Sequence, residues 1–212
     1  ETATNIPFRW QSLSGIEKHM LNFLENHDEQ RIASEFFAGN PFKAIPAMVV
    51  SACMNTNPVM VYFGQELGEA GMDEEGFSGR DGRTTIFDYW TIDTIRRWRN
   101  GGKFDGKLLT KEEKKLQGFY STLLNLCNKE KAIREGVFFD LTYANLEGIV
   151  FNEHKQYAFF RKSGKDLIFI VVNFDENPAA PCVKIPTHAF EYLGIPFKEN
   201  YKAKDLLTGN TE

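Results

Sequence analysis

The chain has 212 residues, of which 42% are hydrophobic and 25% are charged, and its formal net charge at pH 7 is -4. This is the composition of a globular protein, and the length allows one or two domains with hydrophobic cores. A nucleic acid or an anionic membrane surface would call for a basic excess, so neither is an expected partner. No apolar run in the sequence approaches the ~18 residues that a membrane-spanning helix needs.

The three cysteines are widely spaced, at Cys53, Cys127 and Cys182. An odd number at such spacings favours neither a disulfide framework nor a zinc site. Cys53 and Cys127 fall on apolar helical positions, where a free cysteine usually acts as a small hydrophobe. We therefore expect a soluble protein with reduced cysteines. Its cellular location stays open, because the N-terminus has no signal-peptide pattern and the chain need not begin where the gene product begins.

Residues 20–66 predict a strand, a helix and a second strand. The apolar run 20–24 ends in the polar cluster 25–31, as a buried parallel strand does before a loop. Residues 40–54 predict a helix, because the segment opens with an asparagine suited to the N-cap and a proline suited to the first turn. Residues 59–63 predict the second strand. Because polar residues follow both strands, the unit fits a βα barrel or a doubly wound sheet, whose sites collect at the carboxyl ends of strands.

Residues 67–91 show no periodicity and predict a long loop, of the kind that often carries function. The basic run 96–99 is interleaved with apolar residues, which favours a helix face over a binding patch. Residues 110–127 predict the clearest helix of the chain. Thr110 and Glu113 form a capping box there, and apolar residues recur at steps of three and four.

From about Val137 onward the pattern predicts an all-β module. Residues 157–161 and 167–174 are β-rich, and the turn sequence 163–166 between them predicts a hairpin. Residues 183–185 are a further candidate strand.

The segment 23–28 reads Phe-Leu-Glu-Asn-His-Asp and places a histidine beside an aspartate in the loop after a buried strand. From the residues alone, such a pair fits a functional site and a structural contact equally well. The segment resembles the motif at the seventh barrel strand of the α-amylase family (glycoside hydrolase family 13). Residues 57–66 resemble the eighth-strand segment of that family, with its aromatic-aromatic-Gly-x-Glu ending.

Three further segments resemble the family in its own chain order. Residues 80–84 with Trp90 are similar to the loop after the eighth strand, residues 118–128 to the final barrel helix, and residues 157–174 to the first strands of the C-terminal β-sandwich.

The resemblance implies an α/β plus all-β fold. Residues 1–136 would form the last two βα units of a TIM (β/α)8 barrel, and residues 137–212 an antiparallel β-sandwich domain. The family's nucleophile lies in a Gly-x-Arg-x-Asp setting on the fourth strand, and its acid/base is a Glu after the fifth. Neither setting occurs in this sequence. Because a barrel takes ~250 residues and a sandwich up to ~100, we expect the chain to be part of a parent enzyme and to be inactive alone.

The resemblance also implies residue roles. Asp28 matches the third catalytic carboxylate, which binds sugar hydroxyls and stabilises the oxocarbenium-like transition state. His27 matches a substrate-binding histidine, and Asn26 belongs to the same substrate-binding triplet. Arg31 lies just beyond, also as a substrate-site residue, where it could neutralise or orient Asp28 or Glu25.

The implied function is that of a retaining glycoside hydrolase that cleaves α-1,4-glucosidic bonds of starch, glycogen or maltooligosaccharides. An α-glucan oligo- or polysaccharide is then the expected partner. Two alternatives stay open, a non-catalytic amylase-like carbohydrate-binding protein and an α-glucan transglycosylase. No cofactor is evident in this segment. The acidic loop 73–81 does not have EF-hand spacing, and calcium is expected only through positions upstream.

Overall fold

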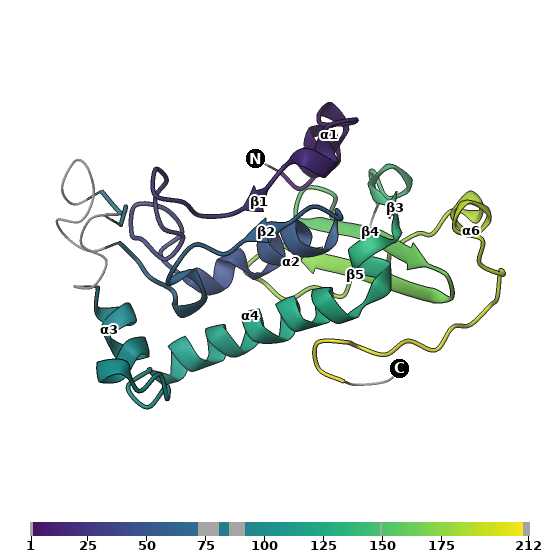
Figure 1. Ribbon diagram of the computed structural model, residues 1–212. Helices are drawn as coiled ribbons and strands as arrows, with labels where there is room; N and C mark the ends of the chain where they lie inside the picture. The colour runs from purple at the N-terminus through teal and green to yellow at the C-terminus, as the bar shows by residue number, and fades with distance from the viewer. Residues whose placement is uncertain (1, 72–80, 85–91, 149, 210–212) are drawn as a thin grey trace. The chain divides into compact units, whose positions relative to one another are not determined.

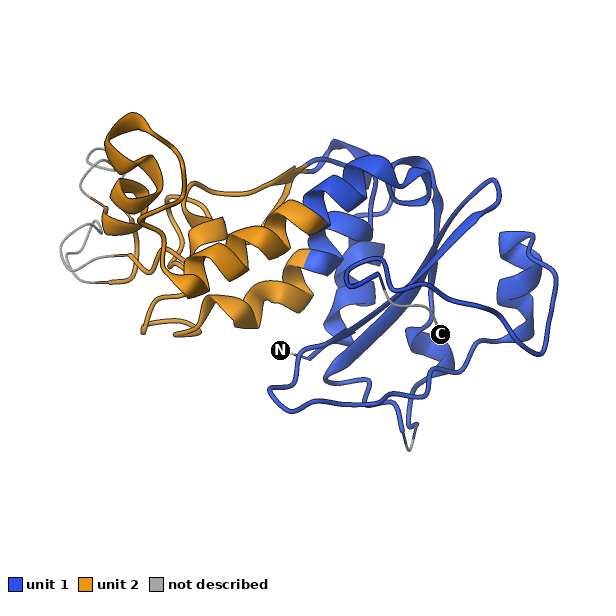
Figure 2. Cartoon of the chain, turned by 90° about the horizontal axis from the view of Figure 1, so that it is seen from below, with its two compact units in different colours: residues 1–20, 49–58, 123–212 blue, residues 21–48, 59–122 orange. Residues whose placement is uncertain are grey.

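A computed structural model describes the chain at residues 2–71, 81–84, 92–148 and 150–209 (Figure 1). The chain divides into two compact units (Figure 2), with unit 1 formed by residues 1–20, 49–58 and 123–212 and unit 2 by residues 21–48 and 59–122. Among the described residues, no helix combines the length and the apolar character that crossing a membrane requires.

Unit 2 contains two short parallel strands and the helices that connect and follow them. In chain order its elements are β1 (Asn22–Phe23), η2 (Pro41–Ala44), the first part of α2 (Ile45–Cys53), β2 (Val59–Met60), η3 (Gln65–Leu67), α3 (Asp93–Arg99), η5 (Asn100–Gly102) and most of α4 (Lys111–Lys129). β1 pairs with β2 in parallel, with Asn22 opposite Val59. The predicted strand–helix–strand unit is therefore confirmed.

β2 ends earlier than the predicted strand 59–63. The Tyr62 carbonyl accepts a hydrogen bond from the Gln65 backbone N–H at 2.9 Å, and Gly64 has a φ of +79°. The strand therefore ends at Met60, and the backbone turns at residues 62–65. Gly64 has the positive φ of this turn, which glycine adopts with the least strain.

The sequence signals for the starts of the predicted helices 40–54 and 110–127 are confirmed. The Asn40 side chain accepts a hydrogen bond from the Phe42 backbone N–H at 3.0 Å, which caps η2. At the start of α4, the Glu113 N–H donates to Thr110 Oγ1 at 3.1 Å, and the Thr110 N–H donates to Glu113 Oε2 at 2.7 Å. The predicted capping box is confirmed, and so is the helix that carries the basic run 96–99.

Unit 1 contains a three-stranded antiparallel sheet in the order β3-β4-β5. In chain order its elements are α1 (Asn5–Ser12), η1 (Glu17–His19), the ends of α2 and α4, α5 (Lys131–Glu135), β3 (Val137–Asp140), η6 (Thr142–Ala144), β4 (Gln156–Ser163), β5 (Asp166–Asn173) and α6 (Thr187–Leu193). β4 is the buried central strand, and Ser163 lies opposite Asp166 at the turn to β5. The predicted hairpin is confirmed.

Arg161 of β4 is a buried cation whose hydrogen-bond partners are backbone carbonyls. Nη1 donates to the Met54 carbonyl at 2.7 Å, Nη2 to Ile133 at 2.7 Å and Nε to Ala132 at 3.2 Å. These carbonyls belong to the end of α2 and to α5, and helix C-termini favour a positive charge. Burial lowers the pKa of Arg161 to about 10. The side chain therefore ties the sheet to two helix ends.

Two parts of the prediction for the C-terminal region are wrong. Residues 183–185 are not a strand, because the Asn145 side chain takes the bonds that a neighbouring strand would take. Its Oδ1 accepts from the Lys184 N–H at 2.6 Å, and its Nδ2 donates to the Lys184 carbonyl at 3.0 Å. The region after Val137 is also not all-β, since α6 lies in it. The second sheet of a sandwich is not among the described residues, and the boundary between residues 136 and 137 stays a prediction.

Cys53 and Cys127, predicted as free cysteines on apolar helical positions, lie side by side in unit 1. Their sulfur atoms are 3.6 Å apart, and both are free thiols. The predicted loop at residues 67–91 falls outside the described residues at 72–80 and 85–91, and with it most of the acidic stretch and Trp90.

Candidate functional site

The predicted site residues lie in unit 2, in the loop that follows β1. His27 Nε2 is 3.4 Å from Asp28 Oδ2, and the two side chains are 48% and 66% exposed. Asn26 Oδ1 accepts hydrogen bonds from the backbone N–H groups of Asp28 at 2.9 Å and Glu29 at 2.8 Å. Asn26 therefore fixes the turn that presents the histidine and the carboxylate to solvent.

A buried ion pair supports this loop from beneath. Arg31 is 0% exposed and Glu25 is 2% exposed, and Arg31 Nε lies 3.1 Å from Glu25 Oε2. Glu25 Oε1 accepts the Ile32 N–H at 2.6 Å, and Arg31 Nη2 donates to the Phe63 carbonyl at 2.8 Å. Of the two partners expected for Arg31, the geometry supplies Glu25. A direct contact between Arg31 and substrate stays a prediction.

The aromatic-aromatic-Gly-x-Glu segment after β2 lies against the same arginine. Arg31 Cζ is 4.9 Å from the centre of the Tyr62 ring and 5.6 Å from that of Phe63, both within cation–π range. Burial raises the pKa of Glu25 more than Arg31 lowers it, and burial also raises the pKa of Glu66. The carboxyl ends of both parallel strands thus carry acidic groups that share one buried cation.

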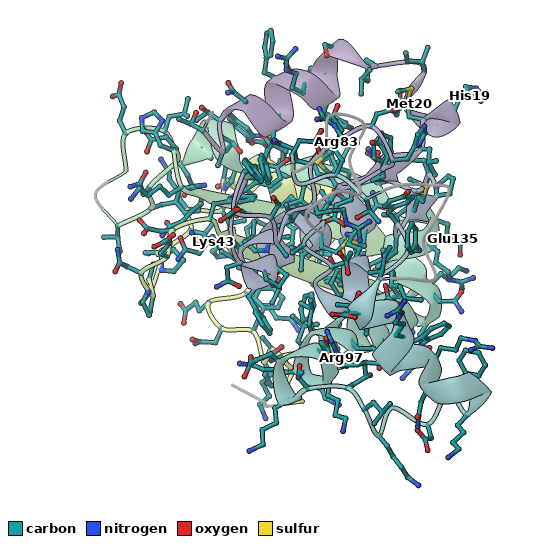
Figure 3. All side chains as sticks on the ribbon, turned by 90° about the vertical axis from the view of Figure 1, so that its left-hand side faces the viewer. His19, Met20, Lys43, Arg83, Arg97 and Glu135 are labelled. Carbon is teal, nitrogen blue, oxygen red and sulfur yellow. The ribbon has the colours of Figure 1, made fainter. Side chains whose placement is uncertain are left out.

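Residues 81–84 form a third part of the site that the sequence prediction did not assign a role. Arg83, which is labelled in Figure 3, donates from Nε to the Asp28 carbonyl at 2.5 Å, and its Nη1 pairs with Asp81 Oδ2 at 2.9 Å. A pattern of aspartate, glycine and arginine signals a turn, but it does not reveal which loop the turn contacts, because Arg83 and Asp28 are separated by 55 positions.

A cavity of about 360 Å³ also lies in unit 2, lined by residues of η2, η3, α3 and α4. It contains a charged contact, since Arg97, which is labelled in Figure 3, donates from Nε to Glu113 Oε1 at 3.0 Å. None of the predicted site residues lines it. In the described part of the chain, no group of three His, Cys, Asp or Glu side chains is placed to hold a metal ion.

Solved structures with a similar fold carry carbohydrate-enzyme names. An AmyP variant in complex with maltotriose aligns with a TM-score of 0.63 at 17% identity, covering 100% of this chain and 40% of that one. A debranching enzyme from Nostoc punctiforme, soaked with acarbose, gives 0.52 at 15%, covering 82% and 29%. A trehalulose synthase mutant in complex with Tris gives 0.52 at 15%, covering 86% and 44%. This chain therefore spans less than half the length of each.

Identities this low show the fold alone, which is derived from a TIM barrel. A search of curated proteins gives no match. The family described as alpha amylase, catalytic domain, matches residues 6–136, which is more than half of the chain and includes the loop with His27 and Asp28. The chain therefore belongs to the α-amylase family.

Proposed function

We propose that the chain forms part of a retaining glycoside hydrolase that cleaves α-1,4-glucosidic bonds of starch, glycogen or maltooligosaccharides. The observation that carries the proposal is the exposed His27–Asp28 pair, 3.4 Å apart on the loop after a parallel strand. An exposed carboxylate with a fixed backbone can bind two sugar hydroxyls. These bonds strengthen as positive charge develops on the sugar ring, so the carboxylate lowers the barrier.

The other residues of the loop have supporting roles in this proposal. His27 donates a hydrogen bond to the same sugar, and Asn26 acts by holding the turn through its two backbone hydrogen bonds. Arg31 acts through Glu25 and the Phe63 carbonyl. The nucleophile and the acid/base belong to upstream barrel strands of the parent enzyme, as does any calcium site. The isolated chain is therefore inactive, and glucan hydrolysis by purified residues 1–212 would contradict this.

The test is Asp28→Asn in the full-length protein, with Glu29→Gln as the matched control. Both variants remove one exposed carboxylate from the same loop. We expect Asp28→Asn to lower kcat by about 100- to 1000-fold, the size of effect seen when one transition-state contact is lost. We expect Glu29→Gln to keep kcat within about twofold, because exposed substitutions away from the chemistry change little. Wild-type turnover in Asp28→Asn would remove the assigned role.

Product analysis of the wild-type protein separates the alternatives. A hydrolase releases reducing ends in step with bond cleavage, whereas a transglycosylase passes the glycosyl group to a second sugar. A carbohydrate-binding protein retains maltooligosaccharides without turnover, and Asp28→Asn then changes affinity alone. The neighbour named trehalulose synthase is the reason for testing sugar acceptors.

A further inference from the structure

We infer that Asp81 and Arg83 are positioning residues for Asp28, forming a clamp with Gly82 that fixes the backbone of the site loop. The inference rests on the proposed function, in which Asp28 binds the sugar. The clamp is residues 81–83, and the site loop is residues 26–34. Neither Asp81 nor Arg83 is assigned a contact with substrate.

The first observation is the way in which Arg83 reaches the loop. Its Nε donates to the backbone carbonyl of Asp28 at 2.5 Å, so it holds the main chain of the proposed transition-state stabiliser and not its carboxylate. The Asp81 carboxylate orients the guanidinium, since Oδ2 accepts from Arg83 Nη1 at 2.9 Å and Oδ1 accepts from the Arg83 backbone N–H at 3.0 Å. An arginine fixed at two points loses little further freedom when it holds a third.

The second observation is that the main chain of the clamp also bonds to the site loop. The Asp81 carbonyl accepts from Gln30 Nε2 at 3.0 Å, and the Gly82 carbonyl accepts from the Arg31 backbone N–H at 2.7 Å. Each of the three clamp residues therefore contacts the stretch 28–31. These three contacts set the register between the two segments.

The third observation is the close approach at Gly82. This residue has a φ of +82°, and a Cβ on it would lie 2.2 Å from Ser34 Oγ and 2.9 Å from Ser34 Cβ. Any side chain here would push the clamp away from the site loop. The two segments approach this closely only because residue 82 is glycine.

The clamp determines how precisely the Asp28 carboxylate is positioned. Its side chain is 66% exposed, so packing does little to fix it, and its backbone is held by Asn26 on the amide side and Arg83 on the carbonyl side. A misplacement of about 1 Å in a catalytic group can lower a rate by about 100-fold. Loss of the clamp should therefore lower kcat more than it changes KM.

The experiment uses the full-length protein and maltooligosaccharide substrates. We expect Arg83→Ala to lower kcat by about 10- to 100-fold, with KM changing less than kcat. Guanidinium ion in the assay should restore part of kcat, because it can occupy the vacated site beside Asp81. The kcat of Arg83→Lys should lie between those of the wild type and Arg83→Ala, because lysine has one donor group in place of the forked guanidinium. Arg134→Ala is the matched control, since this arginine is exposed on α5. A kcat loss restored by neither guanidinium nor lysine would overturn the inference.

Amide hydrogen exchange separates the clamp from the proposed function. Arg83→Ala and the gentler Asp81→Asn should both speed exchange at the Glu29 and Arg31 amides, whose acceptors are Asn26 Oδ1 and the Gly82 carbonyl. Exchange in β4 should not change. A wild-type protein without glucan activity would count against the proposed function alone, and exchange would then decide the clamp. Unchanged exchange at both amides, in both variants, would overturn the clamp even in an active enzyme.

Discussion

Arg31 in unit 2 and Arg161 in unit 1 are both almost completely buried, but they have different partners. Arg161 binds three neutral carbonyls at distances of 2.7–3.2 Å. Arg31 has an acidic partner, one carbonyl and two aromatic rings, and its Nη1 has no hydrogen-bond partner in the described part of the chain. The first arrangement satisfies the cation with fixed groups. The second pairs the cation with a titratable carboxyl group next to a solvent-exposed loop, and it leaves part of the guanidinium without a hydrogen bond.

The two environments predict different roles, with Arg161 serving the fold and Arg31 serving the proposed site. A cation held by helix-end carbonyls stabilises those ends and is independent of pH over the ordinary range. A cation paired with Glu25 depends on the protonation of that carboxyl, and any change there reaches the loop through the Ile32 amide. Variants of the two arginine networks should therefore separate stability from activity.

Arg161→Met should give the largest loss of stability, about 3 to 5 kcal/mol, because the Met54 and Ile133 carbonyls lose their Arg161 donor, whereas the Ala132 carbonyl keeps the Gly136 N–H. Arg161→Lys should recover only part, since one ammonium group does not match the fork of three donors. Urea denaturation of the full-length protein measures the effect, with exposed Arg134→Met as the control. A loss below about 1 kcal/mol would show that water satisfies these carbonyls as well as Arg161 does.

Glu25→Gln should cost less stability, about 2 to 3 kcal/mol, because the Phe63 carbonyl and the aromatic rings still hold Arg31. The new amide can still accept from the Ile32 N–H. Activity should fall more than in any Arg161 variant compared at equal folded fraction. If both variants lowered kcat equally, the proposed division between fold and site would be wrong.

The stability of Glu25→Gln relative to wild type should also depend on pH. Burial raises the pKa of Glu25 above its ordinary value of 4.5. Between the unfolded and folded pKa values, the native state binds more protons than the unfolded state, so stability falls as pH rises through that window. Glu66 and Asp140, whose pKa values burial also raises, add to this slope in both proteins. The difference in stability between wild type and Glu25→Gln should therefore grow on acidification, because only the wild type gains stability when Glu25 is protonated. An unchanged difference would show that Glu25 titrates normally.

Local sequence signals predicted the elements but not the contacts that organise the site. The capping box, the parallel strands and the hairpin depend on neighbouring residues or on hydrophobic pattern, and all are confirmed. The bonds of Arg161 to Met54 and of Arg83 to Asp28 join positions 107 and 55 residues apart, and no local pattern encodes such pairings. At Lys184, predicted to lie in a strand, the backbone N–H bonds to the Asn145 side chain, which is another contact between residues far apart in the sequence.

Lys131→Gln should have the smallest effect, below about 0.5 kcal/mol, although it breaks an ion pair on the same helix that binds Arg161. Lys131 Nζ is 3.2 Å from Glu135 Oε1, but the side chains are 59% and 53% exposed. Water and salt screen such a pair, and ordering two long side chains offsets much of its attraction. Urea denaturation at low and high NaCl measures any contribution. A loss comparable to that of Arg161→Met would mean that α5 is stabilised by its surface charges. A negligible loss would mean that the hydrogen bonds from Arg161 to the Ala132 and Ile133 carbonyls contribute more to the stability of α5 than this ion pair does.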